Sequence, residues 1–176
     1  AIGPQRETSL ITEETPKHPV SSYGESKAAA EERLLRLQNE IGIDICIIRA
    51  PLIYGKGLHK ESRLSFFIDK LLDGSFRFIG NGTNFVSLCQ VETLIDLIFK
   101  LIEASSIGKF KILHIADPIE LTLRDLTKIA AKFLKIQAPN KSVPYPLAKL
   151  AAIFLDFLSA VTGMKFYLTN ERVEEL

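Results

Sequence analysis

The sequence predicts an α/β protein, and three observations support that prediction. Short apolar runs alternate with longer segments whose apolar residues recur at helical spacing, which is the pattern of strands joined by helices in a largely parallel sheet. With 47% hydrophobic and 24% charged residues among 176, the chain can bury one sizeable core. Its net charge is +1, and no basic stripe alternates with aromatic residues, so nucleic acid is not an expected partner.

The first half predicts one long helix followed by a strand. The loop over 1–20 leads to a helix that starts near 19–22. Ser26–Glu40 is rich in helix formers, and Gly42 ends the helix. Ile43–Arg49 is apolar on both faces and short, which predicts a buried parallel strand. The pattern then predicts a helix over 64–72 ended by Gly74, a strand over 76–79, a glycine turn at 80–82 and a strand over 85–91.

The second half predicts three helices and another strand. Val91–Ala104 has an apolar face that we expect to pack against a core, and 109–115 returns as a strand. Thr122 is an expected N-cap for Leu123–Leu134, with Asp125 completing a box-like start. The apolar helix over 147–162 contains Lys149 and Asp156, so we expect it to be buried, and peripheral membrane contact is the less favoured alternative.

Several features bound the chemistry and the compartment. Cys46 and Cys89 lie in apolar runs without metal-ligand or Cys-x-x-Cys spacing, which predicts buried thiols in a reducing, cytoplasmic setting and no metal site. The N-terminus has no signal-peptide pattern and no initiator Met, so we expect the chain to begin inside a longer protein. None of the ten glycines forms the Gly-rich turn that binds a dinucleotide pyrophosphate.

Tyr23 and Lys27 are the strongest catalytic candidates. Residues four apart at the start of a helix share one face, so an ammonium can lie beside a phenol. A free phenol is a poor proton-transfer group at neutral pH because its pKa is about 10, but a nearby positive charge favours the phenolate. The pair can therefore act as a general acid and base. The spacing alone is also compatible with a solvated helix face.

Three motifs resemble landmarks of the extended short-chain dehydrogenase/reductases, in the same order along the chain. The run Thr12–Glu31, which contains Tyr23 and Lys27, resembles the active-site segment of the epimerase/dehydratase type. Arg49–Gly57 is similar to the motif that follows the next strand and faces the nicotinamide. Residues 80–94 resemble the next landmark, a hairpin followed by a helix.

The resemblance implies a role for each matched residue. Tyr23 would exchange a proton with the substrate, and Lys27 would hydrogen-bond the nicotinamide ribose and favour the phenolate. Pro51 and Leu52 would line the nicotinamide site. The family's catalytic Ser or Thr and its Gly-rich turn would lie upstream of residue 1, and we do not assign the catalytic role to Ser9.

Two departures leave the substrate open. Sugar-nucleotide epimerases commonly have Asn where Leu52 stands and Arg where Val86 stands, and both serve polar groups of the substrate. Lys56, His59 and Lys60 could replace those contacts, or could form a solvated basic loop. The departures, with residues 84 and 90–93, lean toward the branch that resembles 3β-hydroxysteroid dehydrogenases and dihydroflavonol reductases.

The resemblance implies the latter part of a Rossmann-type sheet domain, over 1–54 and 90–116, and a small α/β substrate domain over 55–89 and 117–176, with the N-terminal half of the Rossmann domain missing. The expected function is hydride transfer with NAD or NADP at a secondary alcohol carbon, with a nucleotide sugar narrowly preferred to an apolar hydroxy compound. A non-catalytic binding protein is the remaining alternative. We expect the chain alone to be inactive, and the resemblance leaves room for a homodimer.

Overall fold

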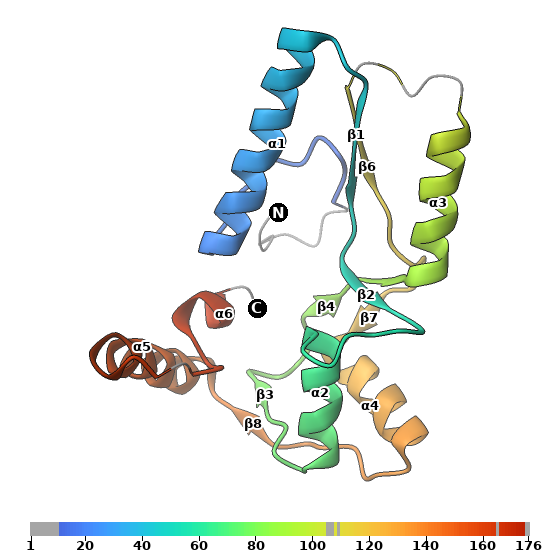
Figure 1. Cartoon of the computed structure of the whole chain (residues 1–176). Coiled ribbons are helices and arrows are strands. Elements are labelled where there is room, and N and C mark those ends of the chain that lie inside the picture. Colours follow the sequence, from blue (N-terminus) through green and yellow to red (C-terminus); the bar gives the residue numbers. More distant parts are fainter. Residues whose placement is uncertain (1–10, 105–107, 109, 165, 175–176) are drawn as a thin grey trace. The chain divides into compact units, whose positions relative to one another are not determined.

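The computed structural model describes residues 11–104, 108, 110–164 and 166–174. They form two compact units (Figure 1). Unit 1 contains the described residues up to Gly55 together with Leu88–Asp117. Unit 2 contains Lys56–Ser87 and Pro118–Glu174. Each unit is therefore built from two separate segments of the chain. The predicted α/β class is confirmed, because helices alternate with mostly parallel strand pairs in the described chain.

Unit 1 has two parallel strand pairs. Its elements are α1 (Ser22–Ile41), β1 (Ile45–Arg49), β2 (Leu52–Tyr54), β5 (Leu88–Gln90), α3 (Val91–Glu103) and β6 (Phe110–His114). Strand β1 pairs with β6, with Ile47 opposite Ile112, and β2 pairs with β5. In Figure 1, α1 and α3 flank the β1–β6 pair. Helix α3 connects β5 of one strand pair to β6 of the other.

Helix α1 begins at Ser22, within the predicted start region 19–22, because Ser21 caps it. The Ser21 hydroxyl accepts a hydrogen bond from the Gly24 N–H at 3.2 Å. This bond satisfies one of the free N–H groups of the first turn. At the other end Gly42 adopts a left-handed conformation, φ 70°, and its N–H donates to the Gln38 carbonyl at 2.8 Å. The whole of the Tyr23–Lys27 segment is therefore helical.

The prediction that Val91–Ala104 packs a broad apolar face against a core is only partly met in the part of unit 1 that the structure describes, because Val91, Leu94, Leu97 and Leu101 are half-buried. Helix α3 covers Val91–Glu103, but none of its residues is buried. Phe99 is 59% exposed and Ile102 is 72% exposed. The reason is geometric, because the β1–β6 sheet beside α3 is only two strands wide and cannot cover the helix face. The predicted burial of strand β1 is also only partly met, because Ile45 alone is buried in it.

Unit 2 combines small strand pairs with four helices. Its elements are α2 (Arg63–Leu72), β3 (Phe78–Ile79), β4 (Phe85–Val86), β7 (Leu121–Thr122), α4 (Leu123–Leu134), β8 (Ser142–Val143), α5 (Tyr145–Thr162) and α6 (Asn170–Glu174). The buried core of this unit contains Leu71, Phe78, Thr127, Ala131 and Val173. Phe78 stacks edge-on against Phe76 at 5.0 Å between ring centroids.

The expected hairpin across residues 80–82 does not form. Strand β3 pairs in parallel with β8, and β4 pairs antiparallel with β7, so the two strands beside the turn bind distant partners. The turn itself is as predicted, with positive φ at Gly80 and Gly82. A Cβ on Gly82 would lie 2.5 Å from the Phe78 ring, so only glycine fits there. The predicted strand over 85–91 is split at Ser87 into β4 and β5.

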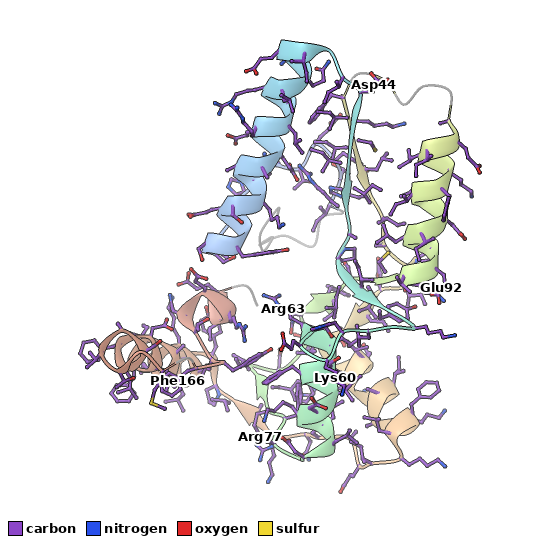
Figure 2. All side chains as sticks on the ribbon, in the orientation of Figure 1. Asp44, Lys60, Arg63, Arg77, Glu92 and Phe166 are labelled. Carbon is purple, nitrogen blue, oxygen red and sulfur yellow. The ribbon has the colours of Figure 1, made fainter. Side chains whose placement is uncertain are left out.

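The prediction that the C-terminal apolar helix is buried is also wrong. Of the 18 residues of α5, only Ala148 and Ala152 are buried. Helix α6, the element that contacts it most, has five residues and is too short to cover it. In the described part of the chain, α5 is the one helix long and apolar enough to cross a membrane. Figure 2 shows side chains of α5 extending away from the neighbouring helix α6.

Candidate active site

Tyr23 and Lys27 lie one turn apart at the start of α1, as the sequence predicts. The Lys27 ammonium nitrogen is 5.3 Å from the centre of the Tyr23 ring. Both side chains are exposed, Tyr23 to 65%. Lys27 forms no ion pair with any residue that the structure describes. The phenol and the ammonium are therefore together and open to a ligand.

A charged clamp holds α1 against β1. Arg49 donates two hydrogen bonds to the Glu31 carboxylate, from Nε to Oε1 at 2.9 Å and from Nη2 to Oε2 at 2.7 Å. Both side chains are nearly buried, with 13% and 10% of their surface exposed. Glu31 is one turn beyond Lys27, on the inward face that also includes Gly24 and Ala28. The clamp therefore fixes the rotation of α1 and with it the direction of the candidate catalytic pair.

The clamp also sets the charge state of Glu31. The hydrogen bonds from Arg49 hold the pKa of the Glu31 carboxyl below its ordinary value, against the opposing effect of burial. Glu31 raises the pKa of Arg49 in turn. Lys17 adds a weaker contact to Glu31 at 3.5 Å. The pair is therefore ionised at neutral pH.

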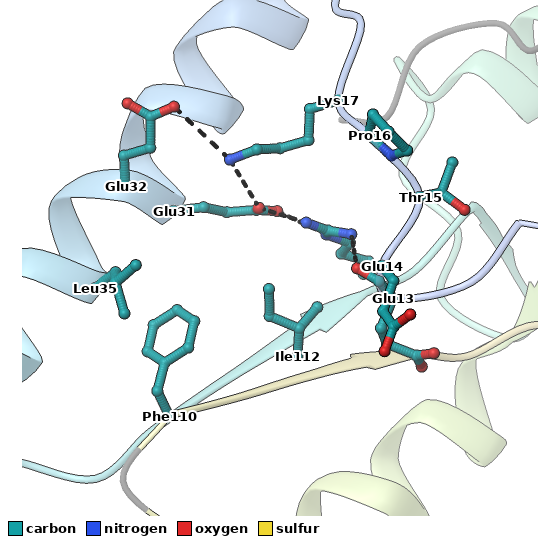
Figure 3. A pocket seen from close by; sticks show the side chains of 11 residues that line it. Glu13, Glu14, Thr15, Pro16, Lys17, Glu31, Glu32, Leu35, Phe110 and Ile112 are labelled. Carbon is teal, nitrogen blue, oxygen red and sulfur yellow. Dashed lines mark hydrogen bonds and ion pairs between the residues drawn. The ribbon is translucent and has the colours of Figure 1, made fainter.

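The segment that precedes α1 is bound to the same network (Figure 3). The His114 backbone N–H donates to the Glu13 carboxylate at 2.8 Å, which lowers the pKa of Glu13. Arg49 Nη1 lies 3.1 Å from His114 Nε2. Residues 13–17 and α1 thus border an open pocket of about 300 Å³ over Phe110 and Ile112. Neither Tyr23 nor Lys27 lines this pocket, so the pocket is separate from the candidate catalytic pair.

Pro51 and Leu52 lie at the carboxyl end of β1, where the chain turns into β2. Helix α1 runs antiparallel to β1, so its first turn and the carboxyl end of β1 lie at one end of unit 1 (Figure 1). Ligands of α/β sheets bind at the carboxyl ends of the strands. Unit 1 therefore brings Tyr23, Lys27, Pro51 and Leu52 to the end where a ligand is expected.

Gly55 and Asp117 shape the loop that follows. Gly55 has φ 133°, and a Cβ there would lie 2.6 Å from Val91 Cγ1, so the close approach to α3 needs glycine. Asp117 accepts a hydrogen bond from the Gln90 N–H at 3.1 Å. Its carboxylate also accepts from the Tyr54 hydroxyl, which raises the pKa of Tyr54. These contacts fix the β2–β5 pair next to Pro51 and Leu52.

The other four predicted site residues belong to unit 2. Lys56, His59 and Lys60 share the exposed loop before α2, where Figure 2 labels Lys60. The His59 Nδ1 accepts from the Glu61 N–H at 3.2 Å, so this ring is held within its own loop. Val86 lies in β4 opposite Leu121 and is half-buried. The three basic residues therefore share one loop. Val86 lies on a different element, β4, which follows α2 and β3 in the sequence.

The sequence analysis missed the clamp of Glu31 and Arg49. These residues are 18 positions apart, and no local motif links them. The one available signal was Arg49 itself, a charge that ends the apolar run Ile45–Ile48. Such a charge at the end of a strand needs a partner. Ser9 lies outside the described residues.

Comparison with known proteins identifies the family. The model of the NAD dependent epimerase/dehydratase family matches residues 1–116. The chain belongs to this family. Its relatives and structural neighbours are extended short-chain dehydrogenase/reductases, as the three motifs predicted, and the family uses NAD.

Two curated relatives differ in the compounds they are named for. The N-acetyl-alpha-D-glucosaminyl-diphospho-ditrans,octacis-undecaprenol 4-epimerase of Escherichia coli O157:H7 is 27% identical over 93% of this chain and 49% of its own length. The 4-hydroxy-2-methyl-3-oxo-4-farnesyl-3,4-dihydroquinoline-1-oxide ketoreductase of Stigmatella aurantiaca is 26% identical over 78% of the chain and 40% of its own length. The chain thus spans half or less of these relatives.

A solved structure supports the fold and the cofactor. The dTDP-glucose 4,6-dehydratase of Streptomyces venezuelae, with NAD bound, has a TM-score of 0.69 and 28% identity to this chain. The match covers 81% of the chain and 44% of the dehydratase. The Rossmann-type assignment is confirmed, and the similarity to roughly half of a longer enzyme agrees with it.

Proposed function

We propose that the full-length protein uses NAD to transfer a hydride at a secondary alcohol carbon of a sugar carried on a diphosphate, as in a 4-epimerase. The observation that carries the proposal is the exposed Tyr23–Lys27 pair on the first turns of α1, clamped through Glu31 to Arg49. A nucleotide sugar is the first carrier that we propose, because the similar dehydratase is named for one. An epimerase, a dehydratase and a dehydrogenase share this hydride-transfer step.

The residues of unit 1 fit the nicotinamide side of NAD. Lys27 is exposed and free of ion pairs within the described chain, so its ammonium can hydrogen-bond a ribose hydroxyl. Pro51 and Leu52 offer a half-buried apolar edge at the same end of the unit. When bound, NAD supplies the hydride acceptor. The phosphate side of the cofactor needs a Gly-rich turn, which the sequence of this chain does not contain.

Tyr23 is the group that we assign to proton transfer. As the phenolate, its oxygen would take the proton from the substrate alcohol while the hydride passes to NAD, and as the phenol it would return that proton in the reverse direction. Ser21 and Glu31 keep both side chains on one face of α1 by fixing its start and its rotation. The intact pair argues against a protein that only binds.

A second carrier is a polyprenyl diphosphate, on which the Escherichia coli relative is named to act. Its match covers 93% of this chain. Even if all the unmatched residues lay at the C-terminus, the match would still extend beyond Thr162, the last residue of α5. The match therefore contains the exposed apolar helix α5. The loss of polar anchors at Leu52 and Val86 is also easier to accommodate when the substrate carries a long apolar group. An apolar hydroxy compound, as in the Stigmatella relative, stays the alternative.

A turnover screen tests the proposed function. Full-length protein with NAD would be incubated with UDP-, GDP- and dTDP-sugars, a polyprenyl-diphosphate-linked N-acetylhexosamine and apolar secondary alcohols. We expect interconversion of a diphosphate-linked sugar, slowed on the order of a hundredfold or more in Tyr23→Phe. For a nucleotide sugar held by the loop before α2, salt and the Lys56→Ala/Lys60→Ala variant should each weaken binding. Turnover of apolar alcohols alone would overturn the proposal.

A further inference from the structure

Every charged side chain of α5 is directed toward α6. Lys149 Nζ is 3.2 Å from the Glu174 carboxylate, and this contact lowers the pKa of Glu174. The Asp156 carboxylate accepts from the Asn170 N–H, the first residue of α6, at 2.8 Å. The two buried residues, Ala148 and Ala152, are close to Lys149 in the chain. Both charged side chains of α5 therefore have partners on the side that faces α6.

The opposite side of α5 is apolar and exposed. Its residues recur at intervals of three and four, so they form one continuous stripe along the helix. We call them the outer stripe, and they are Leu147 (58% exposed), Leu150 (65%), Phe154 (63%), Phe157 (67%) and Val161 (68%). Large apolar side chains in one contiguous patch mark a surface that contacts another apolar phase or molecule.

The contacts with α6 decide between a helix that spans a bilayer and one that lies on it. If α5 spanned, the Lys149–Glu174 pair and Asp156 would enter the hydrocarbon together with α6, at a large cost. A helix that lies in the interface keeps its polar side in water and buries only its apolar side. Tyr145, at the first turn, has the amphipathic ring that favours this boundary.

We propose that the outer stripe of α5 docks the protein on the surface of a lipid bilayer. The proposal rests on the second carrier described above, because a polyprenyl-linked sugar resides in a bilayer and the match to the relative named for such a substrate contains α5. The premise for expecting little membrane contact was a buried α5, and only two of its residues are buried. Because both charged residues of α5 face α6, the outer stripe can enter the apolar part of a lipid surface without burying a charge.

Vesicle flotation tests the docking without requiring turnover. Full-length protein would be mixed with vesicles of phosphatidylcholine, alone or with phosphatidylglycerol, and the floated fraction measured. We expect the wild-type protein to float with both. Leu150→Glu/Phe154→Glu should reduce the floated fraction at least about tenfold, since two side chains that would enter the lipid become charged. The matched control is Ile129→Glu/Phe133→Glu on α4, which changes one aliphatic and one aromatic residue that are also exposed. This control should float like the wild type.

Further measurements separate the alternatives. Tyr23→Phe should float normally, so that a failure of the proposed chemistry leaves this test intact. Far-UV circular dichroism of the Leu150→Glu/Phe154→Glu variant should match the wild type, and Leu150→Ser/Phe154→Ser repeats the test without added charge. Wild-type protein that stays with the soluble fraction would overturn the proposal. A lipid-free dimer that Leu150→Glu/Phe154→Glu dissociates would assign the stripe to a second copy instead, and a lowered melting temperature without any flotation would assign it to another segment of the full-length chain.

Discussion

Tyr23 is positioned by a nearby helix cap and by a clamp between its helix and a distant strand residue. Ser21 starts α1 early enough to include Tyr23 in the first turn, and the Arg49–Glu31 clamp fixes the helix against β1. Lys27 then lies over the Tyr23 ring with its ammonium open to a ligand. In the proposed function, proton transfer and cofactor binding would fall to different side chains on one helix face, so substitution can separate them.

Tyr23→Phe should remove proton transfer and keep NAD binding. The ring still occupies its place, so we expect NAD affinity within about twofold of wild type and a turnover loss on the order of a hundredfold or more. Turnover on the substrate found in the screen and calorimetric NAD titration of the full-length protein measure the two effects. Tyr167→Phe is the matched control, because it loses the same hydroxyl from a half-exposed ring in unit 2. Wild-type turnover in Tyr23→Phe would show that the assigned role is wrong.

Glu31→Gln should destabilise the protein and flatten part of its pH dependence. The change removes a charge that accepts two hydrogen bonds from Arg49, at a cost of about 2 kcal/mol at neutral pH. The folded pKa of Glu31 lies below its ordinary value of 4.5, so its contribution is present above about pH 4.5 and is lost as the pH falls through the folded pKa. Urea unfolding at several pH values should show the gap between wild type and variant narrowing in that acidic range.

Glu32→Gln is the control for this prediction. Glu32 is the next residue in α1, is 59% exposed, and approaches Lys17 and Arg36 only at 3.9 Å. We expect it to change the free energy of unfolding by less than about 0.5 kcal/mol, as for most exposed ion pairs. Equal effects of the two substitutions would contradict the importance of the clamp.

At the scale of the element, α4 shows a start that local chemistry determines. Thr122 accepts from the Asp125 N–H at 3.1 Å, and the Asp125 carboxylate accepts from the Thr122 N–H at 3.3 Å. Thr122→Ala should therefore cost about 1 kcal/mol of unfolding free energy. Gln90→Ala is the control, because Gln90 stands at the N-cap of α3 without a capping bond from its side chain. A urea titration that gave both variants the same loss would contradict the capping argument.

The sequence could predict elements that depend on local contacts, but not those that depend on distant partners. Helix α4 was predicted over its observed bounds because the Thr122 cap acts within three residues. Strand pairing is not local, and β3 and β4 pair with β8 and β7 instead of forming the expected hairpin. The Tyr23–Lys27 pair was predictable because it lies within one turn, whereas the Glu31–Arg49 clamp depends on the packing of α1 on β1.

At the scale of the whole molecule, burial could not be predicted from apolar spacing. The patterns of α3 and α5 each indicate a buried face, but burial also requires a partner of matching size. Beside α3 the sheet of unit 1 has two strands, and beside α5 lies the five-residue helix α6. We therefore expect different partners for the two exposed apolar faces. For α3 we expect further strands of a Rossmann-type sheet. For α5 we expect the bilayer proposed above.

We predict that this 176-residue chain alone does not bind NAD with useful affinity. Unit 1 offers Lys27, Pro51 and Leu52 to the nicotinamide side, but the sequence has no Gly-rich turn to receive the pyrophosphate on a helix N-terminus. Without that turn, the diphosphate of NAD keeps its hydration in water and gains no hydrogen bonds from the chain. Contacts to the nicotinamide side alone would then give only weak binding. Calorimetric titration should give no saturable binding of NAD to the chain at micromolar concentrations, and binding to the full-length protein under the same conditions. Micromolar binding to the chain itself would mean that its own backbone supplies a phosphate site, and would contradict the assignment of that site to a preceding segment.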